Sequence, residues 1–479
     1  MLNTASPGRI AQESFKNRSK ILIIVLSASF MAVLDFNVVS IALPTITTLF
    51  NVPVGLSQWI LTSYQVTMTV TALIFGKLAD YIGKSRLFIL GFLIFTVSSL
   101  ACGLSTFLTE LVLFRILQAI GASMVLSINL AILMQIFPGN EKGKVMGYFT
   151  AIIGLGMLIG PTVGGFIVDV FGWPYIFFIN IPIGIALIIP AIKYLKIEEH
   201  LIKENKKDYI GALLFIISVG TFFMILNDLA SKTINLSVLI PYSAVCAVSL
   251  AAFIRRELTA EKPMLEIALF KIQRFTLSSI SLVLYFTATF ILVLIQPFYF
   301  EGVMGFNPST VGILAAIMPL AMMVSSPISG RIYDSLKLHG TSRVVKNYPM
   351  IGITVMGLAY LICGYAFWSV NLALIIAMFL IAGVCRSIFQ GPNNIDIMSS
   401  LPPEKGNIAS GMINTTTNFG LAFGTAMGAV LLSSFVSFAG YSGSNVLYAG
   451  AGTLAGVCGI ILYISGILCI TGSLLSYRR

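Results

Sequence analysis

The residues best suited to chemistry in this chain are two charges that stand within long apolar stretches. Asp35 lies about fifteen residues beyond Lys20 in an otherwise apolar run. If that run is a helix, a rise of 1.5 Å per residue places Asp35 about 22 Å along it. An ionised carboxylate inside a bilayer costs at least ~2.5–3.5 kcal/mol, and removal from water favours the protonated form. Asp35 is therefore a candidate proton carrier, unless a structural partner keeps it ionised.

Arg115 is the second such charge, in the apolar run 111–121 and at a depth comparable with that of Asp35. A pair between them would offset part of the desolvation cost of both, and protonation of Asp35 would release the bond. Alternatively, the long Arg115 side chain extends to the membrane surface. The functional interpretation predicts that Asp35 and Arg115 together couple transport to protons.

Other polar side chains within apolar runs are candidates for a substrate cavity, although hydrogen bonds between helices would explain them equally well. They are Gln118, Gln390, Asn394, Asn414 and Asn418. The sequence assigns no role to three further charged residues, Glu301, Arg386 and Asp396.

Enzymatic and ATP-driven functions find no support in the sequence. It contains no phosphate-binding loop of the Walker A form, no dinucleotide-binding glycine pattern in a strand–helix context and no recognisable serine or cysteine nucleophile site. His200 and His339 lie in polar loops, and the six cysteines lie singly in apolar runs. We expect no catalytic residue, no metal and no cofactor.

We expect Asp35 and Arg115 to lie in membrane-spanning helices. Of the 479 residues, 57% are hydrophobic and 10% charged, whereas soluble proteins carry about 25% charged residues. The mean hydropathy is +0.96. Runs of about 20 apolar residues span a bilayer. The sequence predicts fourteen such helices near residues 20–44, 58–76, 86–105, 111–137, 145–168, 174–195, 209–228, 234–254, 275–300, 308–330, 348–367, 370–395, 407–435 and 452–475.

The distribution of basic residues predicts the orientation of these helices. With the N-terminus inside, the predicted cytoplasmic segments hold all of the 29 basic residues except Lys232, Arg115 and Arg386. Cytoplasmic loops of membrane proteins are enriched in lysine and arginine. We therefore expect both termini to be cytoplasmic, and we interpret the net charge of +11 as a topology signal rather than as a nucleic-acid footprint.

Short motifs recur in the two halves of the chain. Gly76-Lys77-Leu78-Ala79-Asp80 is echoed by Gly330-Arg331-Ile332-Tyr333-Asp334, and Glu141-Lys142-Gly143 by Glu404-Lys405-Gly406; Arg115 and Gln118 are echoed by Arg386 and Gln390. Paired halves with a substrate site at their interface are common in secondary transporters. We predict a six-helix bundle at 1–200, a linker with two extra helices at 201–268 and a second six-helix bundle at 269–479.

Several motifs, in order along nearly the whole chain, resemble those of the major facilitator superfamily and, within it, of the fourteen-helix drug:proton antiporters. The run 34–44 (LDFNVVSIALP) is similar to that family's helix 1 signature, and 111–121 (LVLFRILQAIG) to its helix 4 motif. The run 76–86 (GKLADYIGKSR) resembles the superfamily's loop between helices 2 and 3, with Tyr81 where arginine is usual. The resemblance implies a gating loop made of Gly76, Asp80, Gly83, Lys84 and Arg86.

The run 156–165 (GMLIGPTVGG) resembles the antiporter motif of helix 5, formed here by Gly156, Gly160, Pro161, Gly164 and Gly165. Small residues let helices pack closely, and proline interrupts the backbone hydrogen bonds. In the family this motif marks exporters rather than uptake symporters.

The resemblance implies a proton-coupled antiporter of the cytoplasmic membrane that exports small lipophilic drugs or cations by alternating access. Its partners would be the substrate, protons and membrane lipids, and we expect a monomer. The alternative is a dedicated proton-coupled exporter of a single metabolite, lipid or antibiotic.

Overall fold

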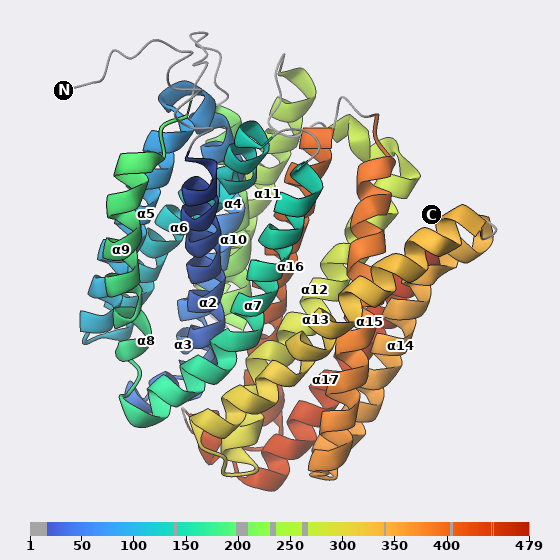
Figure 1. The fold of residues 1–479 in the computed structure, drawn as a ribbon. Coiled ribbons are helices and arrows are strands. Elements are labelled where there is room, and N and C mark those ends of the chain that lie inside the picture. The colour runs from blue at the N-terminus through green and yellow to red at the C-terminus, as the bar shows by residue number, and fades with distance from the viewer. Residues whose placement is uncertain are drawn as a thin grey trace.

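The computed structural model describes residues 17–137, 141–197, 209–229, 236–260, 267–339, 342–402, 406–441, 443 and 445–478. Within these residues the chain is almost entirely helical (Figure 1). The helices are α2 (Arg18–Leu49), α3 (Val54–Ser57), α4 (Trp59–Ile82), α5 (Lys84–Leu104), α6 (Leu108–Ile136), α7 (Lys142–Val170), α8 (Tyr175–Phe178), α9 (Asn180–Tyr194), α10 (Tyr209–Leu229), α11 (Leu236–Thr259), α12 (Gln273–Gly302), α13 (Pro308–His339), α14 (Ser342–Trp368), α15 (Leu372–Ser399), α16 (Gly406–Phe438) and α17 (Ala451–Arg478), with short 3-10 turns at Ile267–Lys271 and Val446–Tyr448.

The described part of the chain contains 13 helical segments that are long and apolar enough to cross a membrane, with α8 and α9 together forming one of them. The 24-residue helix α4 is a further long helix and packs between α6 and α16. Each of the fourteen predicted ranges coincides with one of these helical segments. The prediction of an all-helical, multi-pass membrane protein is therefore confirmed.

Most of the long helices fall into two groups that lie side by side in Figure 1. Helices α2, α4, α5, α6, α7 and α9 contact one another, and so do α12 to α17. The two groups meet mainly where α7 packs on α13 and α4 packs on α16. Of the remaining pair, α10 packs where α4 meets α16, and α11 packs on α10. Val219 and Phe223 of α10 share an apolar cluster with Val66 of α4 and Ala422 of α16.

Glycines at every fourth position allow the closest helix contacts within each group. Cβ atoms added to Gly156, Gly160 and Gly164 of α7 would press against α2; at Gly160 the added atom would lie 2.7 Å from Asn37 Cβ. Gly420, Gly424 and Gly428 of α16 lie in the same way against α12, where a Cβ at Gly424 would lie 2.5 Å from the Thr287 carbonyl oxygen. The same small-residue packing therefore occurs in both groups.

Candidate functional site

Asp35 and Arg115 form a buried ion pair at the centre of the first group of helices. Arg115 Nη1 lies 2.5 Å from Asp35 Oδ2, and neither side chain is exposed. Arg115 Nε also donates to the Ile60 carbonyl at 3.1 Å, and its guanidinium carbon lies 4.2 Å from the centre of the Tyr64 ring. The pairing expected from the sequence is thus present, and Arg115 does not extend to the membrane surface in this structure.

Two amide side chains complete the surroundings of the Asp35 carboxylate. Gln118 Nε2 donates to Asp35 Oδ1 at 2.9 Å, and Asn180 Nδ2 donates to the same oxygen at 2.7 Å. With Arg115 Nη1, the carboxylate therefore accepts three hydrogen bonds from α6 and α9. An ionised carboxylate only accepts, so this arrangement fits the charged form of Asp35. Oδ1 already accepts two of these hydrogen bonds, so a proton on Oδ1 would compete with one of the two amide donors.

Ser99 of α5 also belongs to this group of hydrogen-bonded side chains. Its Oγ accepts from Gln118 Nε2 at 2.7 Å and from Asn180 Nδ2 at 3.3 Å. Asp35, Arg115, Gln118, Asn180 and Ser99 thus connect α2, α5, α6 and α9, and we call these five residues the Asp35 network. The Asp35 network therefore links four helices at one buried point.

Two of these residues, Asn180 and Ser99, were not singled out in the sequence. An asparagine in the apolar run IFFINIPIGI is a signal that could have drawn attention to Asn180, because an amide in lipid needs a partner. Ser99 gives no such signal, since a serine can bond to its own helix. Gln118 was expected as a candidate cavity residue, but it is fully buried in the Asp35 network.

The corresponding position in the second group holds a different arrangement. Arg386 of α15 is 5% exposed and its guanidinium carbon lies 5.8 Å from the centre of the Tyr285 ring of α12. The Nε atom of Arg386 is buried without a hydrogen-bond partner. Tyr285 donates its hydroxyl to Gln390 Oε1 at 3.5 Å. None of the ion pairs in the described ranges involves Arg386.

The remaining polar candidates are scattered over the second group. Asn394 is half-buried and its Oδ1 has no partner, Asn414 is exposed and Asn418 is half-buried. Asp396 accepts from Arg274 Nη2 at 2.6 Å, and Glu301 lies near the end of α12 with Oε1 unpartnered. These residues do not form one cluster in this conformation.

The glycine and proline residues of the 156–165 motif serve two contacts. Gly156, Gly160 and Gly164 face α2, whereas Gly165 faces the Pro308 carbonyl at the start of α13. The Pro161 carbonyl in turn lies against Gly312 of α13. The motif therefore joins the helix that carries Asp35 to the opposite group.

The predicted gating loop is only partly described. Gly83 adopts a φ of +98°, which glycine tolerates, and forms the turn between α4 and α5. Lys84 Nζ donates to Gln135 Oε1 at 2.8 Å, and Arg86 is exposed. Gly76 has open space where a Cβ would be. The side chain of Asp80 lies outside the described set.

Polar contacts between the two groups gather at the end where α2 and α7 finish. Asp169 of α7 accepts from Asn307 Nδ2 at 2.9 Å and from Ser309 Oγ at 2.6 Å at the start of α13. Asn445 Nδ2 donates to Thr48 Oγ1 of α2 at 3.0 Å. Deeper in the seam, Thr425 of α16 donates to Gln65 Oε1 of α4 at 3.1 Å. These bonds hold that end of the two groups together.

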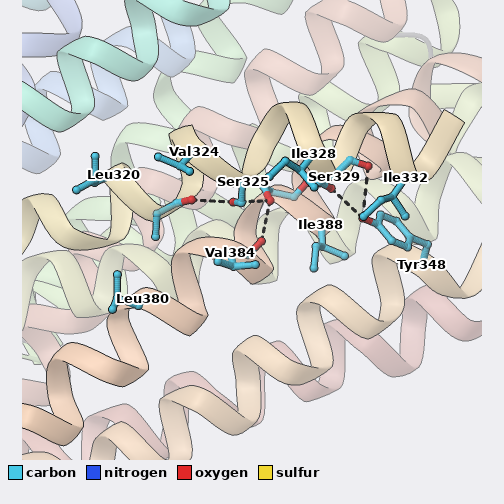
Figure 2. A pocket seen from close by; sticks show the side chains of 12 residues that line it. Leu320, Val324, Ser325, Ile328, Ser329, Ile332, Tyr348, Leu380, Val384 and Ile388 are labelled. Carbon is cyan, nitrogen blue, oxygen red and sulfur yellow. Dashed lines mark hydrogen bonds between the residues drawn. The ribbon is translucent and has the colours of Figure 1, made fainter. Parts of the chain in front are cut away.

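Two hollows in the described residues are unsuited to bind a polar substrate group. The first, of about 570 Å³, lies among α13, α14 and α15 (Figure 2). Its hydroxyls already bond within the protein: Ser325 donates to Ser387 Oγ at 2.9 Å, and Ser329 and Tyr348 bond to each other at 3.1 Å. The second, of about 380 Å³, is lined mainly by aromatic and aliphatic side chains of α10, α11, α12 and α16. Its hydroxyl side chains all donate to carbonyl oxygens of their own helices; they are Thr69, Ser218, Thr415 and Thr416.

Comparisons with known proteins agree with this architecture. The family model described as Major Facilitator Superfamily matches residues 25–425. The chain is 34% identical over 413 residues to the riboflavin transporter RibZ of Clostridioides difficile, covering 86% of this chain and 87% of RibZ. It is 27% identical over 414 residues to the multidrug export protein EmrB of Escherichia coli, covering 85% and 79%.

Among solved structures, the chain resembles a bacterial homologue of the human lysosomal transporter Spinster in an inward-facing, unoccupied conformation. The TM-score is 0.67 at 15% identity, and the match covers 96% of this chain and 98% of the other. At this identity the likeness concerns the fold alone. These relatives are transporters rather than enzymes.

Proposed function

Because the chain belongs to the major facilitator superfamily, we propose that it is a proton-coupled antiporter that exports small lipophilic compounds. The observation that carries the proposal is the Asp35–Arg115 pair within the Asp35 network. Protonation of the buried Asp35 carboxylate would compete with its pairing to Arg115, so this pair is suited to bind and release a proton. The 27% identity to a multidrug export protein supports export as the direction.

The coupling step follows from the hydrogen bonds of Asp35. A proton that reaches Asp35 neutralises the carboxylate and weakens its bond to Arg115. Arg115 keeps two acceptors, Gln118 Oε1 at 2.6 Å and the Ile60 carbonyl at 3.1 Å, so its charge stays partly solvated by the protein. The four helices that meet at the network are then free to shift relative to one another. Proton loss restores the pair and the original packing.

The rocking motion would act at the seams between the two groups. If both termini are cytoplasmic, as the basic residues of the loops indicate, the contacts of Asp169 and Thr48 close the outer end. The cycle would break these bonds and form new ones at the gating loop, to which we assign Gly76, Asp80, Gly83, Lys84 and Arg86. The glycines and Pro161 of α7 would let α2 and α13 slide at close range.

The remaining parts of the proposal concern the cell and the chain as a whole. We propose a location in the cytoplasmic membrane, a monomer, and a division into bundles at 1–200 and 269–479 with the extra helices between them. Because α10 packs where α4 and α16 meet, the pair α10 and α11 lies outside both six-helix groups, which supports this division.

A dedicated exporter of one metabolite is the second candidate. It is favoured by the 34% identity to a riboflavin transporter, which extends over 86% of this chain. In that case riboflavin or a similar planar compound would be the substrate. Competition between riboflavin and unrelated dyes would separate the two candidates, because only a multidrug exporter accepts both.

The first experiment is transport into inside-out vesicles driven by an imposed proton gradient, with ethidium and riboflavin as probes. We expect uptake by the wild type and a loss of at least ~100-fold in Asp35→Asn, equivalent to about 2.7 kcal/mol. Glu141→Gln, which alters a half-buried acid paired with Arg18, is the matched control and should retain uptake. Exchange of labelled for unlabelled substrate without a gradient should persist in Asp35→Asn. Gradient-driven uptake that survives in this variant would assign coupling to another acid.

A further inference from the structure

Arg386 is a buried positive charge for which the proton-coupling mechanism has no use. It is 5% exposed, and its Nε atom has no hydrogen-bond partner. Burying an uncompensated guanidinium is costly, so residues of this kind are normally paired. Tyr285 offers Arg386 a neutral hydroxyl partner and a ring at 5.8 Å, near the limit of a cation–π contact, and neither supplies a counter-charge.

The acids of the second group lie elsewhere. Asp396 stands ten positions along α15 from Arg386 and is bound to Arg274. Glu301 follows Tyr285 by sixteen positions on α12, which corresponds to about 24 Å along the helix. Asp334 is exposed near the C-terminal end of α13. No ion pair among the described residues joins an acid to Arg386, so this buried charge has no acidic partner there.

The neighbours of Arg386 are neutral polar side chains rather than acids. Gln390 lies one helical turn further on α15, so both side chains project from the same face. Its Oε1 accepts from the Tyr285 hydroxyl, and its Nε2 group makes no bond among the described residues. Arg386 is buried and Gln390 is half-buried, so these two polar side chains extend from the protein interior to accessible surface.

We propose that Arg386, with Gln390 and Tyr285, forms the subsite that receives an anionic group of an aromatic substrate. This inference rests on the proposed transport function and narrows its substrate class. A carboxylate or sulfonate would provide the missing counter-charge and accept from the guanidinium and the Gln390 amide. The same charge would weaken the binding of a permanent cation at this subsite without preventing its transport. Export of one anion for one entering proton moves two charges, so the membrane potential would drive it together with the pH gradient.

The test compares two aromatic probes of fixed charge, the monoanion naphthalene-2-sulfonate and the monocation ethidium. Binding to the purified full-length protein in detergent is measured by equilibrium dialysis. We expect the wild type to bind the sulfonate at least about tenfold more tightly than ethidium. Arg386→Gln should weaken sulfonate binding about tenfold while ethidium binding stays equal or improves, and Arg386→Lys should retain most of the sulfonate affinity.

Arg274→Gln is the matched control, because it removes an arginine of the same group that is half exposed and paired with Asp396. It should leave the ratio of the two affinities unchanged. The inference is overturned if the wild type prefers ethidium, if Arg386→Gln weakens both probes equally, or if it weakens neither. Sulfonate binding that depends on Arg386, together with an absence of gradient-driven transport, would uphold the subsite and reject the proton coupling.

Discussion

The two groups of helices share a packing scheme but differ in their buried charges. In both, glycines at every fourth position let one helix press against another, α7 on α2 and α16 on α12. In both, an arginine lies on the neighbouring long helix, Arg115 on α6 and Arg386 on α15. Arg115 donates to an aspartate and to the amide oxygen of Gln118, whereas Arg386 lies near the ring of a tyrosine. The two groups therefore share their backbone packing, and we propose that their different buried charges give them different roles, proton binding in the first group and anion binding in the second.

The largest expected effect is a difference in the free energy of unfolding between variants of the two arginines. Arg115→Met leaves Asp35 buried without its cation, which should cost about 3–5 kcal/mol in the free energy of unfolding. Arg386→Met removes a buried charge that has no acid partner, so it should not lower the free energy of unfolding and should raise it by about 1–4 kcal/mol. Unfolding in mixed micelles would measure both. Equal losses would mean that Arg386 has a structural partner and that the contrast between the groups is false.

The next effect concerns the packing that the two groups share. Gly160→Ala and Gly424→Ala each insert a methyl group where a neighbour lies at 2.7 Å and 2.5 Å, so each should destabilise the protein by about 1–3 kcal/mol. Gly154 of α7 has nothing within 4 Å, so Gly154→Ala is the control and should be neutral or stabilising by up to ~1 kcal/mol. A large difference between the Gly160 and Gly424 variants would show that the glycines are not equivalent.

The smallest expected effect is on the binding preference of a variant in which the second group is made to resemble the first. Tyr285→Asp gives Arg386 an acid partner, so the preference for the aromatic sulfonate over ethidium should fall about tenfold, or about 1.4 kcal/mol. Tyr285→Phe removes only the hydroxyl and should change the ratio by less than about threefold. The ratio of dissociation constants for the two probes is the measurement. An unchanged ratio in Tyr285→Asp would argue that Arg386 does not contact the substrate.

Much of the first site could be predicted because its components are unusual where they stand. An aspartate and an arginine at similar depth in apolar runs have few ways to offset their desolvation, and pairing is the simplest. Asn180 could have been found by the same reasoning. Ser99 could not, since its type and surroundings are ordinary and only its position next to Gln118 gives it a role.

The second site was less predictable, for a different reason. The sequence identified Arg386 and Gln390 as an echo of Arg115 and Gln118 but left their role open. Nothing in the sequence says that Tyr285 of α12 is the residue that faces Arg386. The packing of α12 on α16 at Gly420 and Gly424 fixes the rotation of α12 and thus which side chain faces α15. The four-residue spacing of these glycines is visible in the sequence and indicates a close helix contact, but not which helix forms it.

From the sequence alone, the fourteen helices and the presence of two charges within apolar runs could be predicted, whereas a buried Arg115 was one of two alternatives. Apolar length and the cost of a charge in lipid are properties of a single segment, so they can be read without knowing the fold. The tertiary structure decided which groups meet: Arg115 reaches Asp35 across 80 positions of the chain, and Asn180 reaches it across 145. Such contacts depend on how each helix is rotated and packed, and that rotation is set by the surfaces of several helices together.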